Sequence, residues 1–119
     1  MPFGDSPPLH MHRREDEVFH VLGGRMRFQI DGQERLAGPG DTVIAPKGLP
    51  HTYRVESHEG ARTLTVTRGA DFETLLRQAG RPAERPELPP QMEPTPDIIA
   101  ALGQLCAKNG IDIVGPPLA

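Results

Sequence analysis

Residues 4–24 read "GDSPPLHMHRREDEVFHVLGG" and hold three of the protein's five histidines. His10 and His12 are separated by one residue, and three consecutive carboxylates follow at residues 15–17. Side chains two residues apart in an extended segment point to the same side, so these two imidazoles aim at one point. The stretch then enters a run of β-forming residues at 17–22, which places imidazole and carboxylate groups at the start of a predicted strand.

The segments that follow alternate apolar and polar residues, and turn signals separate them every 6 to 12 residues. Residues 25–30, "RMRFQI", alternate strictly, and the Asp31-Gly32 pair behind them favours a type I′ hairpin turn. Short alternating segments that turns separate at regular intervals predict an antiparallel β sandwich or barrel. The predicted strands are residues 17–22, 25–30, 33–37, 42–45, 51–56 and 62–67.

The C-terminal part of the chain has a different character. Residues 71–80 predict a short helix, and residues 82–96, with six prolines, predict an extended surface linker. A second helix is expected to begin at Pro96, which Thr95 precedes and Asp97 follows. Its apolar face is formed by Ile98, Leu102, Leu105 and Cys106.

The second helix is expected to end at Asn109-Gly110, and "IDIVGPP" behind it favours a final extended segment. We therefore expect a β-barrel at residues 1–70. Residues 71–119 would form a C-terminal tail whose short helices pack on the barrel or on a partner subunit.

Composition and charge exclude several classes of protein. The net charge is -3, with no basic run, so a nucleic-acid partner is not expected. No apolar run reaches the ~18 residues of a membrane span, and the N-terminal "MPFGDSPP" does not resemble a signal peptide. Cys106 is the only cysteine, which excludes an intrachain disulfide. A cytoplasmic protein of one domain is the expectation for 119 residues of this kind.

A metal site is the functional hypothesis that the histidines favour. Glu17 falls on the face of His10 and His12 if a bend at the strand start absorbs the odd residue, and His51 opens a later strand whose inward face carries Tyr53. Three neutral imidazoles and one carboxylate that converge in a small barrel would bind a divalent transition metal, namely Fe, Mn, Ni, Cu or Zn. Open coordination positions would remain for water, substrate or dioxygen.

Each of these residues also has a structural interpretation. A His-x-His pair in a proline-rich loop is often an ordinary surface feature, and Glu17 could be one of several solvated carboxylates. His51 could be a hydrogen-bonded histidine of the core. Only the joint placement of the four residues favours a metal.

The same residues resemble the two signatures of the cupin superfamily. The first signature spaces a glycine, His-x-His, a glutamate and a glycine as in Gly4, His10, His12, Glu17 and Gly24. The second matches Gly40, Pro46, Gly48 and His51, while Val55 replaces its final asparagine. Fifteen residues separate the two motifs, which is similar to the short spacing of compact microbial cupins. The ending "KNGIDIVGPP" resembles, more weakly, small single-domain cupins of the quercetin-dioxygenase-like kind.

The resemblance implies a double-stranded β-helix, the jelly roll of cupins, with a metal inside one end. It implies that His10, His12, Glu17 and His51 are the ligands. Asp16 is the alternative carboxylate, but Glu17 keeps the spacing to the closing glycine and the parity of the strand.

Cupins usually have one or two strands before the first motif, whereas three residues precede Gly4 here. The barrel would be trimmed, another chain would cover its edge, or the true start would lie upstream. An uncovered edge invites pairing. Because the predicted strand at 17–22 is also apolar on both faces, we expect its outer face to be covered and the protein to be a homodimer.

The evidence for a functional role is weaker for the residues outside the proposed ligand set. Tyr53 lies two residues beyond His51 on the same face, which makes it a candidate catalytic proton donor or a substrate contact. His20 is expected at an interface or on the surface, and His58 in a solvated loop. Met26 and Phe28 are expected to pack in the core.

Three functions from different classes follow, each with a small-molecule substrate or ligand. The first is a metal-dependent dioxygenase-like enzyme that acts on a small hydroxylated or aromatic molecule. The second is a metal-dependent isomerase or lyase, in which Tyr53 or a free carboxylate moves the proton. The third is a non-enzymatic module that binds a small molecule, because a fold does not determine a function.

Overall fold

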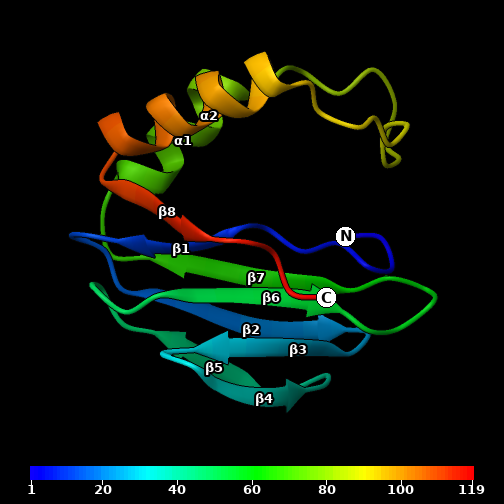
Figure 1. The fold of residues 1–119 in the computed structure, drawn as a ribbon. Coiled ribbons are helices and arrows are strands. Elements are labelled where there is room, and N and C mark those ends of the chain that lie inside the picture. Colours follow the sequence, from blue (N-terminus) through cyan, green and yellow to red (C-terminus); the bar gives the residue numbers. More distant parts are fainter.

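The computed structural model describes all residues, 1–119, and contains two antiparallel sheets that face each other (Figure 1). One sheet has five strands in the order β4-β3-β6-β1-β8, and the other has three in the order β5-β2-β7. The predicted all-β fold with a helical tail is confirmed. The strands are β1 (Leu9–His12), β2 (Glu17–Gly23), β3 (Met26–Ile30), β4 (Gln33–Ala37), β5 (Thr42–Ala45), β6 (His51–Val55), β7 (Arg62–Thr67) and β8 (Ile111–Gly115).

The six predicted strands agree with β2 to β7 to within one residue. Strict alternation places one face of each strand between the sheets, where apolar side chains exclude water. Val55, which replaces the asparagine of the second signature, is fully buried there. The core consists of Phe19, Val21, Met26, Phe28, Ala37, Val43, Ala45, Val55 and Ala61.

The predicted hairpin turn joins β3 and β4. Asp31 and Gly32 both have positive φ, 50° and 78°, as a type I′ turn requires. This turn fixes the register in which Phe28 pairs with Arg35, and it therefore keeps the apolar side chains of β3 on the core face.

The edge of β1 is covered by β8, which comes from the other end of the chain. His10 pairs with Ile113 and His12 pairs with Ile111 in an antiparallel ladder. The final extended segment is thus confirmed as a strand. β8 therefore covers the edge of β1. For the missing N-terminal strands, we had considered a trimmed barrel, cover by another chain, or an upstream segment.

Helices α1 (Asp71–Ala79) and α2 (Pro96–Lys108) lie side by side above β8 in Figure 1. The predicted start of α2 is confirmed, because the Thr95 hydroxyl accepts a hydrogen bond from the Ile98 amide. A second small core, Leu75, Cys106 and Ile111, joins both helices to β8. Neither helix combines the length and the apolar character that a bilayer span needs.

Only the C-terminal half of the apolar face of α2 is buried. Cys106 packs inside, as predicted, whereas Ile98 and Leu102 are exposed. The predicted apolar face is thus only partly covered, because α2 contacts the rest of the chain mainly through its last turns beside β8. The division into a barrel at 1–70 and a tail at 71–119 stays a prediction.

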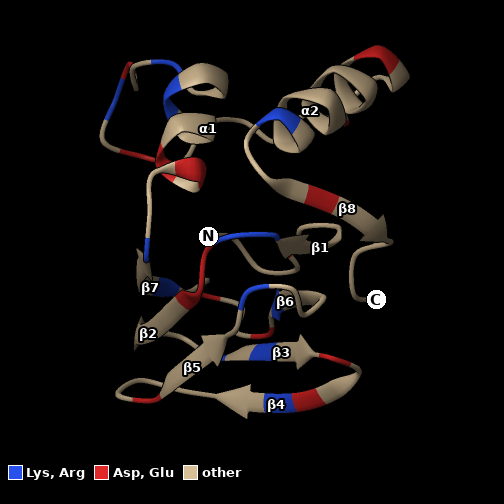
Figure 2. Ribbon diagram, turned by 90° about the vertical axis from the view of Figure 1, so that its left-hand side faces the viewer, with Lys and Arg blue, Asp and Glu red and all other residues tan.

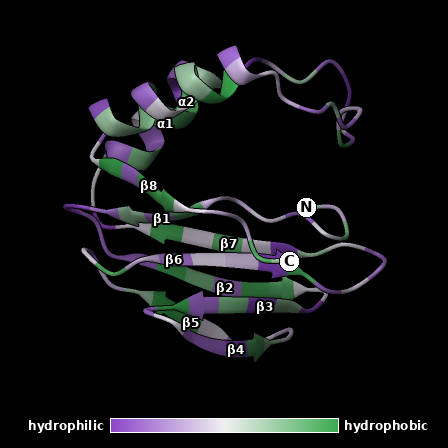
Figure 3. Ribbon diagram, viewed as in Figure 1, coloured by the Kyte–Doolittle hydropathy of each residue, from purple (hydrophilic) through white to green (hydrophobic).

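The outer face of β5-β2-β7 is exposed, whereas we expected it to be covered. Figure 3 shows hydrophobic residues along β2 and β5, and Figure 2 shows no charged residue in β5. No element of the chain lies over this face. Its most exposed apolar side chains are Leu22, Ile44, Leu64 and Val66.

Candidate metal centre

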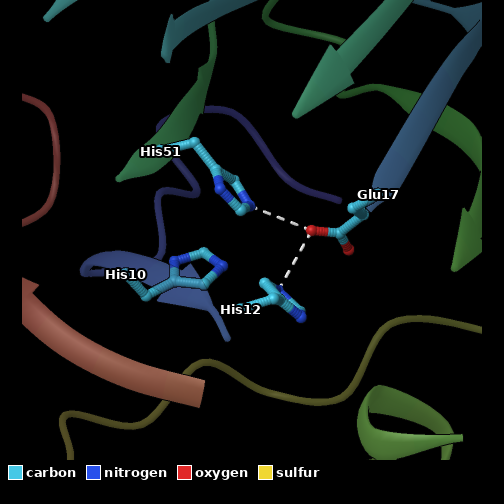
Figure 4. Close-up of side chains that lie close together, drawn as sticks. All are labelled: His10, His12, Glu17 and His51. Carbon is cyan, nitrogen blue, oxygen red and sulfur yellow. Dashed lines mark hydrogen bonds and ion pairs between the residues drawn. The ribbon is translucent and has the colours of Figure 1, made fainter. Parts of the chain in front are cut away.

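Four side chains that can each offer a ligand atom to a metal ion converge from three strands. β1 carries His10 and His12, whereas Glu17 and His51 are the first residues of β2 and β6. His10 and His51 are direct antiparallel partners in the sheet, so their imidazoles emerge side by side. Each of the four residues offers one ligand atom, and these atoms all lie within 4.8 Å of one another (Figure 4).

The Glu17 carboxylate lies between two imidazoles. Its Oε2 atom lies 2.9 Å from His51 Nε2 and 3.2 Å from His12 Nε2. The ring centroids of His10 and His51 are 4.4 Å apart. The odd residue between β1 and Glu17 is absorbed in the loop at 13–16, which is the bend that the sequence requires.

Burial separates the cluster into an inner and an outer part. His12, Glu17 and His51 are each 2% exposed, whereas His10 is only half-buried. His10 therefore marks the side from which a small molecule can approach the cluster.

Hydrogen bonds orient two of the rings. His10 Nδ1 lies 2.8 Å from the Pro8 carbonyl, and His51 Nδ1 lies 3.3 Å from the Leu49 carbonyl. A carbonyl oxygen can only accept, so Nδ1 carries the proton in both rings. The Nε2 lone pair of each ring is then free for a cation, which is the arrangement that metal-ligating histidines commonly show.

His12 provides the test of whether a metal fits. Both of its ring nitrogens are buried and have no hydrogen-bond partner, and Nε2 meets Glu17 only at ion-pair distance. A buried polar atom without a partner costs about 1–3 kcal/mol. A cation between the four side chains would remove that cost at His12 Nε2 and would use every lone pair that converges on the cluster. Three imidazoles and one carboxylate suit a divalent transition metal.

The protonation states of His10 and Glu17 are those that metal binding needs. Burial, followed by the charge of His51, lowers the pKa of His10 to about 4. Burial raises the pKa of Glu17, but its contacts with His12 and His51 outweigh burial and bring that pKa to about 2. His10 is therefore neutral and Glu17 is ionised at neutral pH, as metal binding requires.

Tyr53 lies next to the cluster but does not belong to it. Its ring packs 5.9 Å from the rings of both Phe19 and Phe28. Burial, together with the charges of Asp5 and Glu17, raises the pKa of Tyr53 to about 12. The hydroxyl therefore stays protonated and can donate a hydrogen bond.

The other candidates lie elsewhere. Asp16, the alternative carboxylate, accepts a 2.9 Å hydrogen bond from the Lys47 amide outside the cluster. His20 contacts Thr42 on the outer sheet face, and the exposed His58 stacks on Phe3.

Sequence reasoning missed two residues beside the site. Glu15 is 2% exposed, although it stands in a charged run that is typical of a solvated loop. Phe72 of α1 approaches the His12 ring edge-on, with ring centroids 5.9 Å apart. No local pattern could have indicated either contact, because each depends on how α1 packs against the loop at 13–16.

The sequence of the chain matches one protein family and several known proteins. Residues 1–67 match the family model described as "Cupin domain". The chain is 36% identical over 87 residues to quercetin 2,3-dioxygenase of Bacillus subtilis (strain 168), a match over 73% of this chain and 26% of that protein. It is 42% identical over 55 residues to dimethylsulfoniopropionate lyase DddQ of Ruegeria pomeroyi, a match over 45% and 27%. The chain thus spans about a quarter of the length of these two relatives.

Solved structures agree on the fold. The structure of the lyase DddQ from Ruegeria pomeroyi has a TM-score of 0.52 and 36% identity, and covers 58% of this chain and 34% of that one. KdgF from Halomonas sp. has a TM-score of 0.56 at 23% identity and covers 60% and 66% of the two chains. The likeness to KdgF is one of fold alone.

Proposed function

The chain belongs to the cupin family, and on that premise we propose that it is a metal-dependent, dioxygenase-like enzyme. Its substrate would be a small hydroxylated or aromatic molecule. The observation that carries the proposal is the convergence of His10, His12, Glu17 and His51, whose ligand atoms all lie within 4.8 Å of one another. The likeness to quercetin 2,3-dioxygenase over 87 residues supports this class of chemistry.

Four protein ligands leave coordination positions open. When bound, a redox-active ion such as Fe, Mn, Ni or Cu supplies electron transfer and substrate orientation, whereas Zn supplies Lewis acidity alone. The half-buried His10 marks the open side of the cluster. A hydroxylated substrate would approach from that side and present an oxygen to the open positions.

The cluster borders the aromatic part of the hydrophobic core. Phe19, Phe28 and Tyr53 pack against one another between the sheets, and Phe19 also lies 6.2 Å from His51. No lysine or arginine is buried, so the interior offers a phosphate no cation apart from a metal. The protonated Tyr53 hydroxyl would donate a hydrogen bond to a substrate oxygen.

A metal-dependent lyase is the second candidate, favoured by the 42% identity with the lyase DddQ over 55 residues. In that case a free carboxylate or Tyr53 would take the proton that the substrate loses on elimination, and His10, His12, Glu17 and His51 would hold an ion that supplies Lewis acidity. The two candidates differ in whether dioxygen is consumed.

Elemental analysis and oxygen uptake test the proposal together. Protein purified without chelator should contain about one Fe, Mn, Ni or Cu ion per chain and should consume oxygen with flavonols or other enolic compounds. The His51→Ala variant should lose metal and activity, because it removes a ligand. His58→Ala, which changes an exposed histidine outside the cluster, should keep both.

Other outcomes would contradict the dioxygenase proposal. Bound Zn without oxygen uptake would favour the lyase. A metal-bound protein that consumes neither oxygen nor any tested substrate would instead be a binding module. If no ion binds even when each metal is supplied, the metal centre itself is wrong.

A further inference from the structure

The His12 imidazole is held by packing rather than by hydrogen bonds. Neither ring nitrogen has a hydrogen-bond partner. Three aromatic rings contact it instead: His10 at 5.4 Å with an interplanar angle of 56°, His51 at 5.4 Å with an angle of 15°, and Phe72 edge-on at 5.9 Å with an angle of 68°. His10 and His51 are themselves in the cluster. Phe72 is therefore the contact from outside the metal centre that limits how His12 can turn.

Glu15 fixes the position of Phe72. The Glu15 carboxylate accepts a 2.8 Å hydrogen bond from the Phe72 backbone amide, at the start of α1. An acidic group there is also favoured by the helix dipole. Glu15 is 2% exposed and stands between His12 and Glu17 in the chain, so α1 is attached to the loop that joins two of the candidate ligands.

Two further contacts support the same attachment. Arg14 makes a two-pronged ion pair with Asp71, the first residue of α1, at 3.0 and 3.1 Å. Gly69 lies so close to Glu15 that an added Cβ would be 2.9 Å from the carboxylate oxygen Oε2. Residues 69–72 are thus docked on residues 14–15 through side chains and backbone.

We infer that Phe72 is a positioning residue of the metal centre, which holds the His12 imidazole in its ligating orientation and excludes water behind it, and that Glu15 fixes Phe72 in place. The inference rests on the metal centre proposed above. It concerns the stability of the site and not the identity of the substrate, so it applies equally to an oxygenase and to a lyase.

The test measures how fast the loaded protein releases Co²⁺ to a chelator. Phe72→Ala and Glu15→Ala should each release the ion about 10–100-fold faster, because loss of a group that orients metal ligands typically lowers metal affinity by that factor. The visible spectrum of the Co²⁺ should change as well, because water gains access to the ion. Phe72→Leu, which retains apolar bulk, should recover most of the slow release.

Leu76→Ala provides the matched control, because Leu76 is an exposed apolar residue of the same helix. It should release Co²⁺ at the rate of the unmodified protein. Glu15→Ala displaces the same ring by a second route, so the inference remains testable where Phe72→Ala does not fold.

A purely structural role for Phe72 would give a different result. The thermal stability of the metal-free variant would fall while the release rate and the Co²⁺ spectrum stayed at their unmodified values, and this would overturn the inference alone. Failure of the unmodified protein to bind Co²⁺ would overturn the metal centre and the inference with it.

Discussion

Gly24 and Gly40 are both glycines of the cupin signatures, yet they serve different needs. Both have positive φ, 76° and 90°, which favours glycine. A Cβ at Gly24 would lie 2.1 Å from the Gly60 carbonyl oxygen and 2.7 Å from Ser57 Oγ, whereas a Cβ at Gly40 would meet nothing within 4 Å. Gly24 is therefore required for close packing as well as for its backbone conformation.

These two glycines give a paired prediction. Gly40→Ala should lower the free energy of unfolding by about 1–2 kcal/mol, the cost of the left-handed conformation alone. Gly24→Ala should cost about 3 kcal/mol or more, because the overlap with backbone atoms adds to that cost. Urea denaturation of the metal-free variants measures both. Equal losses at the two positions would show that close packing at Gly24 has no energetic effect.

The four clustered residues could be predicted because their spacing along the sequence indicates that they share a face or follow a characteristic turn. His10 and His12 share a face by strand periodicity, and the turn before His51 matches the second signature. Glu15 and Phe72 could not be predicted, since one stands in a charged run and the other contacts His12 from a helix 60 residues away in the chain. Packing between distant elements leaves no local pattern.

At the scale of elements, β8 links the tail to the candidate site. It pairs with β1, the strand that carries His10 and His12, and its Ile111 is buried with Leu75 and Cys106. The strands β2 to β7 could be predicted from alternation and turn residues. The pairing of β8 with β1 could not, because two segments about 100 residues apart show no sign in the sequence that they are neighbours.

Ile111→Ala should destabilise the fold by about 2–4 kcal/mol, because it leaves a cavity in the small core beneath the helices. The matched control is Ile113→Ala on the same strand, where the side chain is 42% exposed and the cost should be below about 1 kcal/mol. Thermal and urea denaturation would measure the difference. Similar effects at both positions would mean that this core does not hold β8 on the sheet.

In the molecule as a whole, the outer face of β5-β2-β7 is an exposed apolar surface. Val18 pairs with Ile44 on one side and with Val66 on the other, and His20 pairs with Leu64, so the apolar side chains form continuous rows. We propose that a second copy of the chain covers this face as a symmetric dimer. Arg62, at the start of β7, is the charged residue on the exposed side of these strands, and the apolar rows can pack against the same rows of a second copy, as an isologous interface requires.

Light scattering tests this proposal on the protein at micromolar concentration. The unmodified chain should have the mass of a dimer, and Ile44→Asp should have the mass of a monomer, because it would bury two charges at the interface. Leu36→Asp is the control, since Leu36 is equally apolar and more exposed but lies on β4 of the other sheet. A monomeric unmodified protein would contradict the dimer.

We propose that His10, His12, Glu17 and His51 together bind one transition metal ion. The most direct test is an anomalous difference map from crystals of the metal-loaded protein, collected at the absorption edge of the ion. We expect a single strong peak between the three Nε2 atoms and the Glu17 carboxylate, about 2.0–2.2 Å from each ligand atom. A map with no peak among these four side chains, while the crystals contain the metal elsewhere, would contradict it.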